Sequence, residues 1–372
     1  MKIGFDAKRA FYNYSGLGNY SRNVIKSLQQ SFPKNEYHLY TPSLKNAISF
    51  IENDNVYIHT PSKTSGQILK SYWRSFMLKN ELINDNIDLY HGLSNELPSN
   101  ISESKFKSVV TIHDLIFIRY PDLYKPIDRE IYTRKFKYAG KTANKIIAVS
   151  TQTKNDLINF FNINEDKIEV IYQGCDELFK QETSLLEKEK IIKKYNLPSE
   201  YILYVGTIEE RKNLLTIVKA LHQGNIDIPL IIIGKTTKYL KQVVNYICSN
   251  MVENTIFLKA IPLEDLPAIY QLANLFIYPS VFEGFGIPIL EALQSNVPVI
   301  TSKGGCFEEV GGKHTIYVNP MDVDDMIEAI KKVLSDKTLQ NKMKIEGLKH
   351  AQQFSNSLIA EKIMALYKSL LQ

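Results

Sequence analysis

The sequence has few cysteines and no long apolar run, and these absences exclude several classes of protein. Its 372 residues include only three cysteines, Cys175, Cys248 and Cys306, which lie far apart and form no CxxC pair. A scattered, odd-numbered set does not indicate a disulfide framework, so we expect a reducing, cytoplasmic environment. The first residues, MKIGFDAKRA, lack the apolar core of a signal peptide. No stretch approaches the roughly 18 apolar residues of a membrane span.

Short motifs of several enzyme classes are also missing. There is no HxxxH or HExxH pair for a metal, no GxSxG elbow for a serine nucleophile and no GxxxxGK[ST] phosphate loop. His91 and His113 both follow candidate strands but are separated in the sequence. We therefore predict no metal site and no cofactor. The sequence has no recognisable nucleic-acid module, so nucleic acid is not an expected partner.

The formal net charge of +5 is mild, but the basic residues are unevenly placed. Residues 62–80 carry Lys63, Lys70, Arg74 and Lys79 without an acid, and residues 119–145 carry eight Lys or Arg against three acids. Aromatic residues are interleaved in both stretches. Two interpretations stay open: a solvated helix face, or a surface for anionic lipid or a charged acceptor.

Short apolar, β-branched runs alternate with helix-length segments along the whole chain, which indicates βαβ units and an α/β fold. Several runs are continuously apolar, as is typical of strands buried on both faces of a parallel sheet. We predict strands at residues 2–7, 37–41, 56–60, 87–92, 109–114, 145–150 and 168–174 in the first half, and at 201–206, 230–234, 255–260, 275–280, 298–302 and 315–318 in the second.

The length favours two domains rather than one. Residues 177–200 are polar and charged and lack a candidate strand. We predict two Rossmann-like, doubly wound parallel sheets, at residues 1–180 and 181–354, and a terminal helix at 355–372 that could pack back on the first domain. Open α/β sheets bind ligands beyond the carboxyl ends of their strands, so two facing sheets would form a cleft.

The stretch VFEGFGIPILEAL, which follows the strand LFIYPS, combines features of a ligand-binding turn. Glycines let a backbone approach a ligand closely, Pro288 suits the first turn of a helix, and a helix N-terminus favours an anion. Glu283 would lie at the loop tip and Glu291 one turn inside the helix. A carboxylate accepts hydrogen bonds from a diol, so a ribose or sugar is a reasonable partner. The alternative is an ordinary helix with a loop acid and a surface Glu.

A second stretch, YVGTIEERKNLLTIVKAL, places Arg211 and Lys212 at or before a helix N-terminus. Cations there oppose the helix dipole, so local stability does not explain them. A bound phosphate or diphosphate would explain them through charge-assisted hydrogen bonds. A solvated Arg-Lys pair is the alternative.

Two N-terminal stretches carry further candidates. TIHDL puts His113 and Asp114 at a strand end, where they could bind a polar ligand or have a structural role. YNYSGLGNYS holds Gly16 and Gly18 before a helix, but Ser21 occupies the third position of a GxGxxG motif. We therefore reject a nicotinamide-binding fold here and expect a glycine loop open to a phosphate or an acceptor.

Together these stretches resemble family 4 of the nucleotide-sugar glycosyltransferases, which have the GT-B fold, and in particular its mannosyltransferase-like members. The most specific part is AIYQLANLFIYPSVFEGFGIPILEALQSNVPVITS, whose Glu-x7-Glu spacing matches the family signature. YVGTIEERKN, TIHDL, SGLGNYS, IIAVSTQTKNDL and VIYQGCDELF match weaker family blocks in the expected order. The resemblance covers nearly the whole chain.

The resemblance implies roles for the residues of the second domain. Glu291 is similar to the acid that binds the donor ribose, and Glu283 to the acid beside the transferred sugar. Gly284, Phe285 and Gly286 resemble the loop whose amides contact sugar hydroxyls and phosphate. Ile287 follows in the same donor-binding loop.

The remaining roles concern the diphosphate and the reacting face. Arg211 and Lys212 match the pair that neutralises the leaving diphosphate, and His113 matches the histidine near the sugar, with Asp114 beside it. Gly16 and Gly18 match the loop that closes over the diphosphate or the acceptor. Gly206 corresponds to a family glycine that many members follow with a basic residue, whereas this chain has Thr207. This departure leaves fewer cations for the diphosphate.

The implied activity is metal-independent, retaining transfer of a sugar from a nucleotide-sugar donor to a glycan or lipid-linked acceptor of a surface polysaccharide or glycolipid. The first domain would bind the acceptor and the second the donor, with possible contact to an anionic membrane. The wording of TIHDL and EGFGIPILEA leans towards a GDP-mannose-like donor, and a UDP-sugar stays open. The alternatives are a nucleotide-sugar epimerase on a similar fold and a non-catalytic sugar- or lipid-binding protein.

Overall fold

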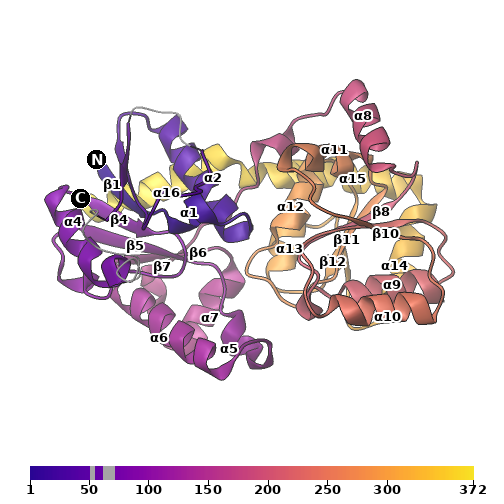
Figure 1. Cartoon of the computed structure of the whole chain (residues 1–372), viewed down its shortest axis with the longest axis horizontal. Helices are drawn as coiled ribbons and strands as arrows, with labels where there is room; N and C mark the ends of the chain where they lie inside the picture. The colour runs from indigo at the N-terminus through magenta and orange to yellow at the C-terminus, as the bar shows by residue number, and fades with distance from the viewer. Residues whose placement is uncertain (51–54, 62–71) are drawn as a thin grey trace. The chain divides into compact units, whose positions relative to one another are not determined.

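The structure, a computed structural model, describes residues 1–50, 55–61 and 72–372 (Figure 1). Lys63 and Lys70 of the first basic stretch lie outside the described residues. The chain forms two compact units: unit 1 comprises Met1–Cys175 and Phe354–Gln372, and unit 2 comprises Asp176–Gln353. The sequence prediction divides the chain at residues 180 and 354 and gives acceptor binding to the first domain and donor binding to the second. This division of roles stays a prediction.

Unit 1 is built on a seven-stranded parallel sheet with the order β3-β2-β1-β4-β5-β6-β7. Its strands are β1 (Lys2–Asp6), β2 (Glu36–Tyr40), β3 (Val56–His59), β4 (Leu89–Gly92), β5 (Lys107–Ile112), β6 (Lys145–Ala148) and β7 (Ile168–Val170). Its main helices are α1 (Lys8–Tyr12), α2 (Gly16–Ser31), α4 (Leu78–Asn84), α5 (Ile116–Arg119), α6 (Pro126–Thr142), α7 (Thr151–Phe161) and α16 (Asn356–Leu371). Shorter helical segments are η2 (Trp73–Met77), η3 (Ile101–Glu103), η4 (Pro121–Leu123) and η5 (Glu165–Lys167).

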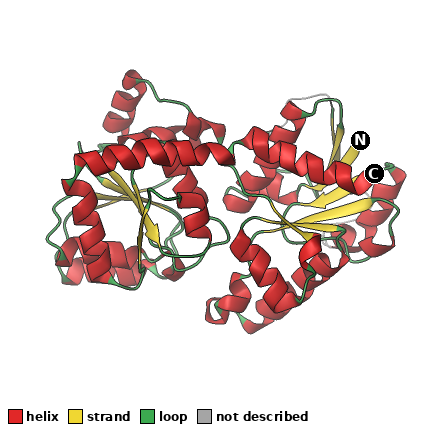
Figure 2. Cartoon of the chain, turned by 180° about the vertical axis from the view of Figure 1, so that it is seen from behind, coloured by secondary structure: helices red, strands yellow, loops and turns green. Residues whose placement is uncertain are grey.

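Helices cover both faces of this sheet, as Figure 2 shows. Ile3 and Phe5 of β1 are fully buried in a cluster with residues of α2 and α16. Gly4 points to the other face, where an added Cβ would lie 3.1 Å from the Leu82 side chain of α4. Successive strand residues thus pack against different layers, which explains why these strands are continuously apolar.

Unit 2 has a six-stranded parallel sheet with the order β10-β9-β8-β11-β12-β13. Its strands are β8 (Ile202–Val205), β9 (Leu230–Ile233), β10 (Thr255–Leu258), β11 (Leu275–Tyr278), β12 (Val299–Ser302) and β13 (Ile316–Val318). Its helices are α8 (Leu185–Tyr195), α9 (Leu214–Gln223), α10 (Leu240–Ser249), α11 (Leu266–Leu272), α12 (Ile287–Gln294), α13 (Cys306–Gly311), α14 (Val323–Ser335) and α15 (Lys337–Ala351). Short 3₁₀ segments are η6 (Glu177–Lys180), η7 (Glu210–Lys212), η8 (Leu263–Asp265) and η9 (Gln352–Phe354).

The prediction of two α/β units with parallel, doubly wound sheets is confirmed, and each predicted strand overlaps an observed one. In unit 2 the strand order reverses between β8 and β11, and in unit 1 between β1 and β4. Such a switch point opens a crevice at the carboxyl ends of the strands, which is where open α/β sheets bind ligands. In the part of the chain that the structure describes, no helix has both the length and the apolar character needed to cross a bilayer.

Candidate active site

Glu283 is the centre of a hydrogen-bonded cluster at the carboxyl edge of the unit 2 sheet. Its Oε1 accepts hydrogen bonds from the Tyr278 hydroxyl at 2.7 Å and from the Ser280 hydroxyl at 2.9 Å. The same oxygen lies 2.8 Å from Arg211 Nη1 and 3.9 Å from Lys212 Nζ. The sequence placed these acidic and basic residues in separate motifs, and the β8–β11 switch point brings them together.

The cluster keeps Glu283 ionised. Burial by itself would raise the pKa of this carboxyl group, but Arg211, Lys212 and the two hydroxyl donors outweigh it and hold the pKa below its usual value. The side chain is only 14% exposed. A buried carboxylate with this many partners is not the stray loop acid of the alternative interpretation.

Arg211 is a partner of two carboxylates rather than a solvated surface residue. Its Nη2 lies 2.6 Å from Glu209 Oε1, its Nη1 pairs with Glu283, and it also donates to the Phe282 carbonyl. Its backbone carbonyl accepts from the Val281 amide at 2.8 Å, so η7 and the loop after β11 are joined directly. The guanidinium therefore holds the shape of this loop and also compensates the negative charge of Glu283.

Lys212 lies close enough to both acids of the Glu-x7-Glu motif to influence their charge. Its ammonium lies 5.5 Å from the centre of the Tyr278 ring and lowers the pKa values of both Glu283 and Glu291. Gly206 provides the room for it, since an added Cβ would lie 3.3 Å from Lys212 Cδ and 3.3 Å from the Tyr278 ring. The Thr207 carbonyl accepts from the Glu209 amide at 2.9 Å, so this residue shapes the turn after β8.

The glycine loop leads directly into α12. The helix begins at Ile287, one residue before the proline that the sequence suggested, with Gly286 as its N-cap at φ 115°. Only glycine adopts this backbone angle readily. Phe285 is 3% exposed, so its side chain belongs to the core.

Glu291 lies inside α12, and its Oε2 accepts a hydrogen bond from the Tyr270 hydroxyl at 3.0 Å. Burial raises the pKa of Glu291 to about 7, although the Tyr270 hydrogen bond and Lys212 act in the opposite direction. The carboxyl group is thus partly buried and balanced between its neutral and charged forms. A surface glutamate on an ordinary helix would not show this environment.

In unit 1, the His113 imidazole has a partner at each ring nitrogen. Nε2 lies 2.9 Å from the Leu93 carbonyl and Nδ1 lies 3.2 Å from the Gln173 amide nitrogen. A carbonyl can only accept and an amide N–H can only donate, so the ring carries its proton on Nε2. Burial lowers the pKa of His113 to about 4, which keeps the ring neutral. The sequence allowed a ligand-binding or a structural role, and these contacts show a ring held within the protein.

The other N-terminal candidates have local structural roles. Asp114 Oδ1 accepts from the Ile116 amide at 3.1 Å at the start of α5. Gly16 and Gly18 lie in the first turn of α2 rather than in a loop before it, which corrects the sequence prediction. An added Cβ at Gly18 would lie 1.8 Å from the Asn13 carbonyl oxygen, whereas Gly16 has open space. Gly18 is thus needed for close packing and Gly16 is not.

A buried polar network adjoins His113 through Tyr20, whose ring centre lies 4.7 Å from that of the histidine. His91 is fully buried, with Nδ1 2.5 Å from the Tyr367 hydroxyl of α16 and Nε2 2.8 Å from Thr111 Oγ1. The Tyr20 hydroxyl lies 2.9 Å from the same Thr111 oxygen. Burial lowers the pKa of His91 to about 3. This histidine joins β4, β5 and α16 and has a structural role.

Sequence reasoning missed Tyr270, Tyr278, Ser280 and Gln173, which hold the acids and the histidine in place. Tyr278 and Ser280 stand in the IYPS segment that the family resemblance already included, so the motif carried a signal. Tyr270 and Gln173 also lie in quoted family blocks, but they act across elements, and no spacing in the sequence indicates their contacts.

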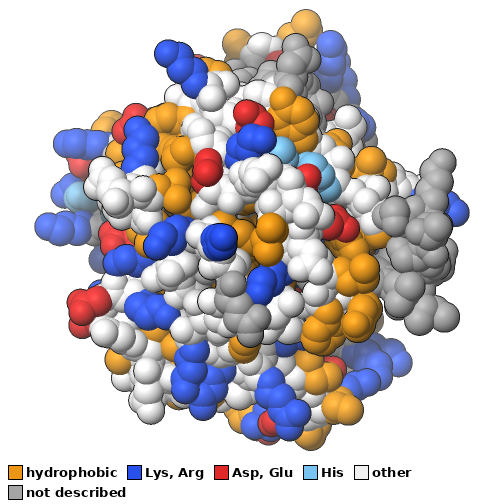
Figure 3. All heavy atoms as spheres, turned by 90° about the vertical axis from the view of Figure 1, so that its left-hand side faces the viewer, with side chains coloured by type: hydrophobic (Ala, Val, Ile, Leu, Met, Phe, Trp, Pro, Cys, Tyr) orange, Lys and Arg blue, Asp and Glu red, His pale blue; other side chains and the backbone are white. Residues whose placement is uncertain are grey.

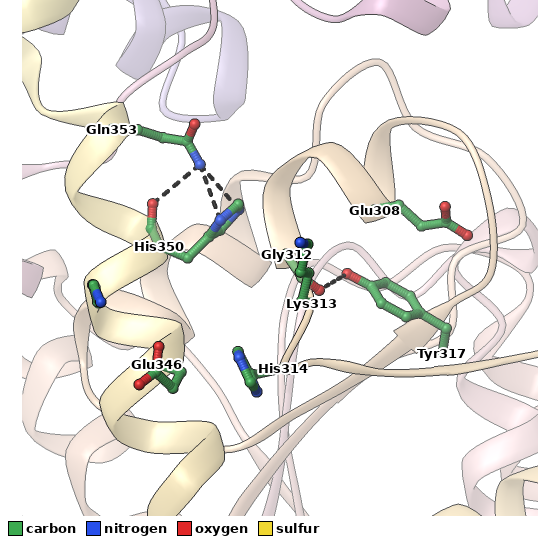
Figure 4. Close-up of a pocket in the computed structure, with 9 residues that line it drawn as sticks. Glu308, Gly312, Lys313, His314, Tyr317, Glu346, His350 and Gln353 are labelled. Atoms are coloured by element: carbon green, nitrogen blue, oxygen red, sulfur yellow. Dashed lines mark hydrogen bonds between the residues drawn. The ribbon is translucent and has the colours of Figure 1, made fainter.

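A separate pocket of ≈ 860 Å³ in unit 2 lies outside this cluster (Figure 4). It is lined by residues 312–314, which lead from α13 to β13 and so lie at the amino ends of the strands, and by α15. The His350 ring packs on Gly312 and contacts the Glu309 carbonyl and the Gln353 amide. Because Glu283, Glu291, Arg211 and Lys212 are not among the residues that line this pocket, we do not assign the donor to it.

Comparison with known proteins links both units to one family. Residues 187–350 match the family model "Glycosyl transferases group 1", and residues 14–177 match "Glycosyltransferase Family 4". O-antigen chain mannosyltransferase B of Escherichia coli is 30% identical over 390 residues, covering 100% of both chains.

Solved structures share the fold at lower identity. Sucrose-phosphate synthase from Thermosynechococcus elongatus superposes with a TM-score of 0.80 at 19% identity, over 100% of this chain and 99% of that chain. Anabaena Alr3699/HepE in complex with UDP-glucose gives a TM-score of 0.74 at 16% identity, over 99% and 100% of the two chains. At these identities the likeness shows the fold alone. Because a mannosyltransferase aligns along the full length and each half matches a glycosyltransferase model, the chain belongs to glycosyltransferase family 4 and is a hexosyltransferase with the GT-B fold.

Proposed function

We propose that this enzyme transfers a hexose from a nucleotide-sugar donor to a glycan or lipid-linked acceptor during synthesis of a surface polysaccharide, with retention of configuration and without a metal. The observation that carries the proposal is the cluster of Glu283, Arg211 and Lys212 at the carboxyl edge of the unit 2 sheet, with Glu291 one helical turn into α12. In this proposal unit 2 binds the donor and unit 1 binds the acceptor.

The basic residues would stabilise the leaving diphosphate. Breaking the bond between sugar and diphosphate builds negative charge on the leaving group, and fixed positive charges lower the energy of that state. Lys212 is suited to this task because its ammonium stands 3.9 Å from Glu283 and next to the turn at Gly206. Arg211 would act mainly by holding Glu283 and the loop, since its guanidinium contacts two carboxylates. The first turn of α12 adds the positive end of a helix dipole.

The two acids would bind different parts of the donor. An ionised Glu283 at the loop tip can orient the sugar or stabilise positive charge that develops on its ring. Glu291, in its ionised form, can accept hydrogen bonds from both hydroxyls of the donor ribose. In unit 1, the His113–Asp114 turn is rigid, since both His113 nitrogens are already bonded within the protein.

We favour a GDP-mannose-like donor. Support comes from the name of the full-length relative, an O-antigen chain mannosyltransferase, and from the wording of TIHDL and EGFGIPILEA. A UDP-sugar is the other option, and the structural neighbour from Anabaena carries UDP-glucose. The acceptor would be a growing glycan or its lipid-linked precursor.

The purified enzyme should be tested against a panel of GDP- and UDP-sugars by thermal shift and by slow donor hydrolysis. We expect one donor to raise the unfolding temperature and to release free nucleoside diphosphate. A response to no donor would count against the proposal. Product analysis without an acceptor distinguishes the nucleotide-sugar epimerase, because an epimerised donor in place of hydrolysis would show that alternative to be correct.

We further infer that α6 brings unit 1 to an anionic membrane, where a lipid-linked acceptor would be found. Ile127 and Ile131 are 68% and 44% exposed and lie one turn apart on α6, which a purely solvated face does not explain. A hollow of ≈ 420 Å³ beside α6 is lined by Phe117 and Phe160 together with Arg129 and Lys137. Figure 3 shows basic and hydrophobic side chains interspersed over one face of the molecule. Basic amphipathic helices bind anionic lipid in this way.

Vesicle sedimentation tests this inference. We expect the enzyme to bind vesicles that contain phosphatidylglycerol, to bind phosphatidylcholine vesicles weakly, and to lose binding in a double variant with Ile127→Asp and Ile131→Asp. The matched control is Ile345→Asp, on an exposed position of α15 in unit 2. Equal binding by all three proteins would contradict the inference.

A further inference from the structure

Three side chains of unit 1 form a cluster that the proposed transfer does not use. His38 comes from β2, His59 from β3, and Asp85 is the C-cap of α4. One nitrogen or oxygen atom from each lies within 4.8 Å of the others. The sequence indicated no metal-ligand spacing because these residues are far apart along the chain and meet only in the folded sheet.

Strand register explains how they meet. In the parallel pair, His38 stands opposite Tyr57 and Tyr40 stands opposite His59. Alternate residues of a strand share one face, so these four rings lie on the same side of the sheet edge. The Tyr40 and His59 rings are stacked with centroids 4.5 Å apart. The last turn of α4 lies against this face and contributes Asp85.

The three residues are linked through their polar atoms. His38 Nδ1 lies 3.0 Å from His59 Nε2, and His59 Nδ1 lies 3.3 Å from Asp85 Oδ2. Tyr40 donates a hydrogen bond of 2.6 Å to the same Asp85 oxygen. A hydroxyl that fixes a carboxylate in this way is typical of the supporting contacts around metal ligands.

One nitrogen of the cluster is left unsatisfied. His38 is 7% exposed at its side chain, and within the described residues its Nε2 has no hydrogen-bond partner, although Glu36 Oε2 lies 3.7 Å away. If His38 Nδ1 donates to His59, Nε2 is a bare acceptor in a buried position, which is costly. A cation bound to Nδ1 would move the ring proton to Nε2, where the Glu36 carboxylate could accept it.

The type of ligand defines the type of ion. Imidazole nitrogens suit borderline transition metals such as Zn²⁺ and Co²⁺, whereas Mg²⁺ and Ca²⁺ prefer oxygen alone. Tetrahedral bonds of about 2.0–2.1 Å place ligand atoms roughly 3.3 Å apart. His38 Nδ1 and His59 Nε2 are 3.0 Å apart, close to that value, and one ligand atom from each of the three residues lies within 4.8 Å of the others.

We propose that His38, His59 and Asp85 form a structural site for a transition-metal dication of the Zn²⁺ class, which joins the edge strands β2 and β3 to the C-terminus of α4. The side chains of His59 and Asp85 are 24% and 29% exposed, so water can reach the site and complete the coordination. The site is independent of the proposed transfer, which uses no metal.

The test uses the full chain without a polyhistidine tag, treated with a chelator and then titrated with Co²⁺ and Zn²⁺. We expect one equivalent of Co²⁺ to produce the visible absorption of a four-coordinate ion, Zn²⁺ to displace it and raise the unfolding temperature, and Mg²⁺ to do neither. His59→Gln and Asp85→Asn replace partly exposed side chains, so these variants should fold, and we expect each to weaken binding at least about tenfold. His222→Gln, at an exposed histidine of unit 2, is the control and should bind like the wild type.

Two results would overturn the proposal: no saturable Co²⁺ signal in the folded wild type, or a signal that the His59 and Asp85 variants retain in full. The cluster would then be a hydrogen-bonded relay without a metal. These readouts do not involve the donor, so they stand whether or not the proposed transfer activity is found.

Discussion

At the scale of single residues, Lys212 connects the two acids of the site. Its ammonium affects the charge of both Glu283 and Glu291, yet its own contact with Glu283 is a loose one of 3.9 Å. Arg211 has close carboxylate partners at 2.6 Å and 2.8 Å. Lys212 can therefore turn towards an incoming diphosphate at a lower free-energy cost than Arg211 can.

Lys212→Ala should lower kcat by about 10²- to 10³-fold, because one fixed donor to the developing charge is lost. The measurement is steady-state transfer with the donor that the panel identifies. Lys219→Ala is the control. It removes a cation of α9 whose Nζ lies 5.7 Å from the centre of the Tyr246 ring, and this variant should keep the wild-type kcat. Unchanged transfer in the Lys212 variant would refute the role given to this residue.

Glu291 gives a prediction for the dependence of stability on pH. Its pKa is raised to about 7, so the folded chain holds this proton more tightly than the unfolded chain does. Stability from this group is present at low pH and is lost as the pH rises through about 7. Glu291→Gln does not titrate, so its free energy of unfolding relative to wild type should improve by up to about 3 kcal/mol between pH 4.5 and pH 8.

Denaturant unfolding of both proteins at several pH values measures this difference. A difference that stays constant with pH would show that the Glu291 carboxyl group is not shifted. Donor binding should change in the opposite direction, since the ribose hydroxyls need the ionised carboxylate, and so wild-type affinity should fall as the pH drops below about 7.

At the scale of elements, the start of α12 combines a backbone requirement with the donor binding that we propose for it. Gly286 has φ 115°, and an added Cβ would also lie 3.2 Å from Ile289 Cδ1. The loop that precedes it is held by Glu283 and Arg211, so it cannot relax freely. Strain at this position would pass directly to the amides at the helix N-terminus.

Gly286→Ala should therefore destabilise the enzyme by about 1–3 kcal/mol and weaken donor binding. Gly16→Ala is the control for stability: its Cβ enters open space at the first residue of α2, so the free energy of unfolding should stay equal or rise slightly. Thermal or denaturant unfolding compares the two variants. Equal destabilisation by both would contradict the explanation from backbone angle.

The elements also show what the sequence could and could not predict. Strands such as LIIIG and VVTIHD were predictable because parallel strands with helices on both faces are apolar throughout. The Glu-x7-Glu turn was predictable because its acids, glycines and helix start are contiguous. The first turn of α2 was placed wrongly as a loop, since its glycines suggested flexibility whereas Gly18 serves close packing against Asn13.

Contacts that depend on register or on tertiary packing were beyond the sequence. His38 and His59 meet through the β2–β3 pairing, and Tyr270 reaches Glu291 from a different helix. The two partners of the His113 ring, Leu93 and Gln173, follow different strands, so these contacts could be found only from the folded structure. No local pattern records such distances.

At the scale of the whole molecule, unit 2 is one continuous stretch, whereas unit 1 is completed by the C-terminal helix. α16 packs against α2, and its Ile363 and Met364 belong to the same buried cluster as Ile3 and Phe5. Tyr367 of α16 also holds His91 through a contact of 2.5 Å. Half of the protein thus depends on residues from both ends of the sequence.

A chain truncated after Gln353 should lose the structure of unit 1, because removal of α16 exposes the apolar cluster and leaves His91 without its hydroxyl partner. The segment 176–353 expressed alone should fold cooperatively and bind the nucleotide, since its core lies entirely within unit 2. Circular dichroism and amide hydrogen exchange on both fragments test this. A well-protected unit 1 in the truncated chain would contradict it.

This interrupted arrangement has a consequence for biosynthesis. As the chain leaves the ribosome, α1 and α2 cover one apolar face of the first sheet only in part, and the rest stays open through the synthesis of residues 176–353 until α16 arrives. The inserted unit can meanwhile fold by itself. Unit 1 is therefore completed only after all of unit 2 has been made, and the docking of α16 is the step that closes its core.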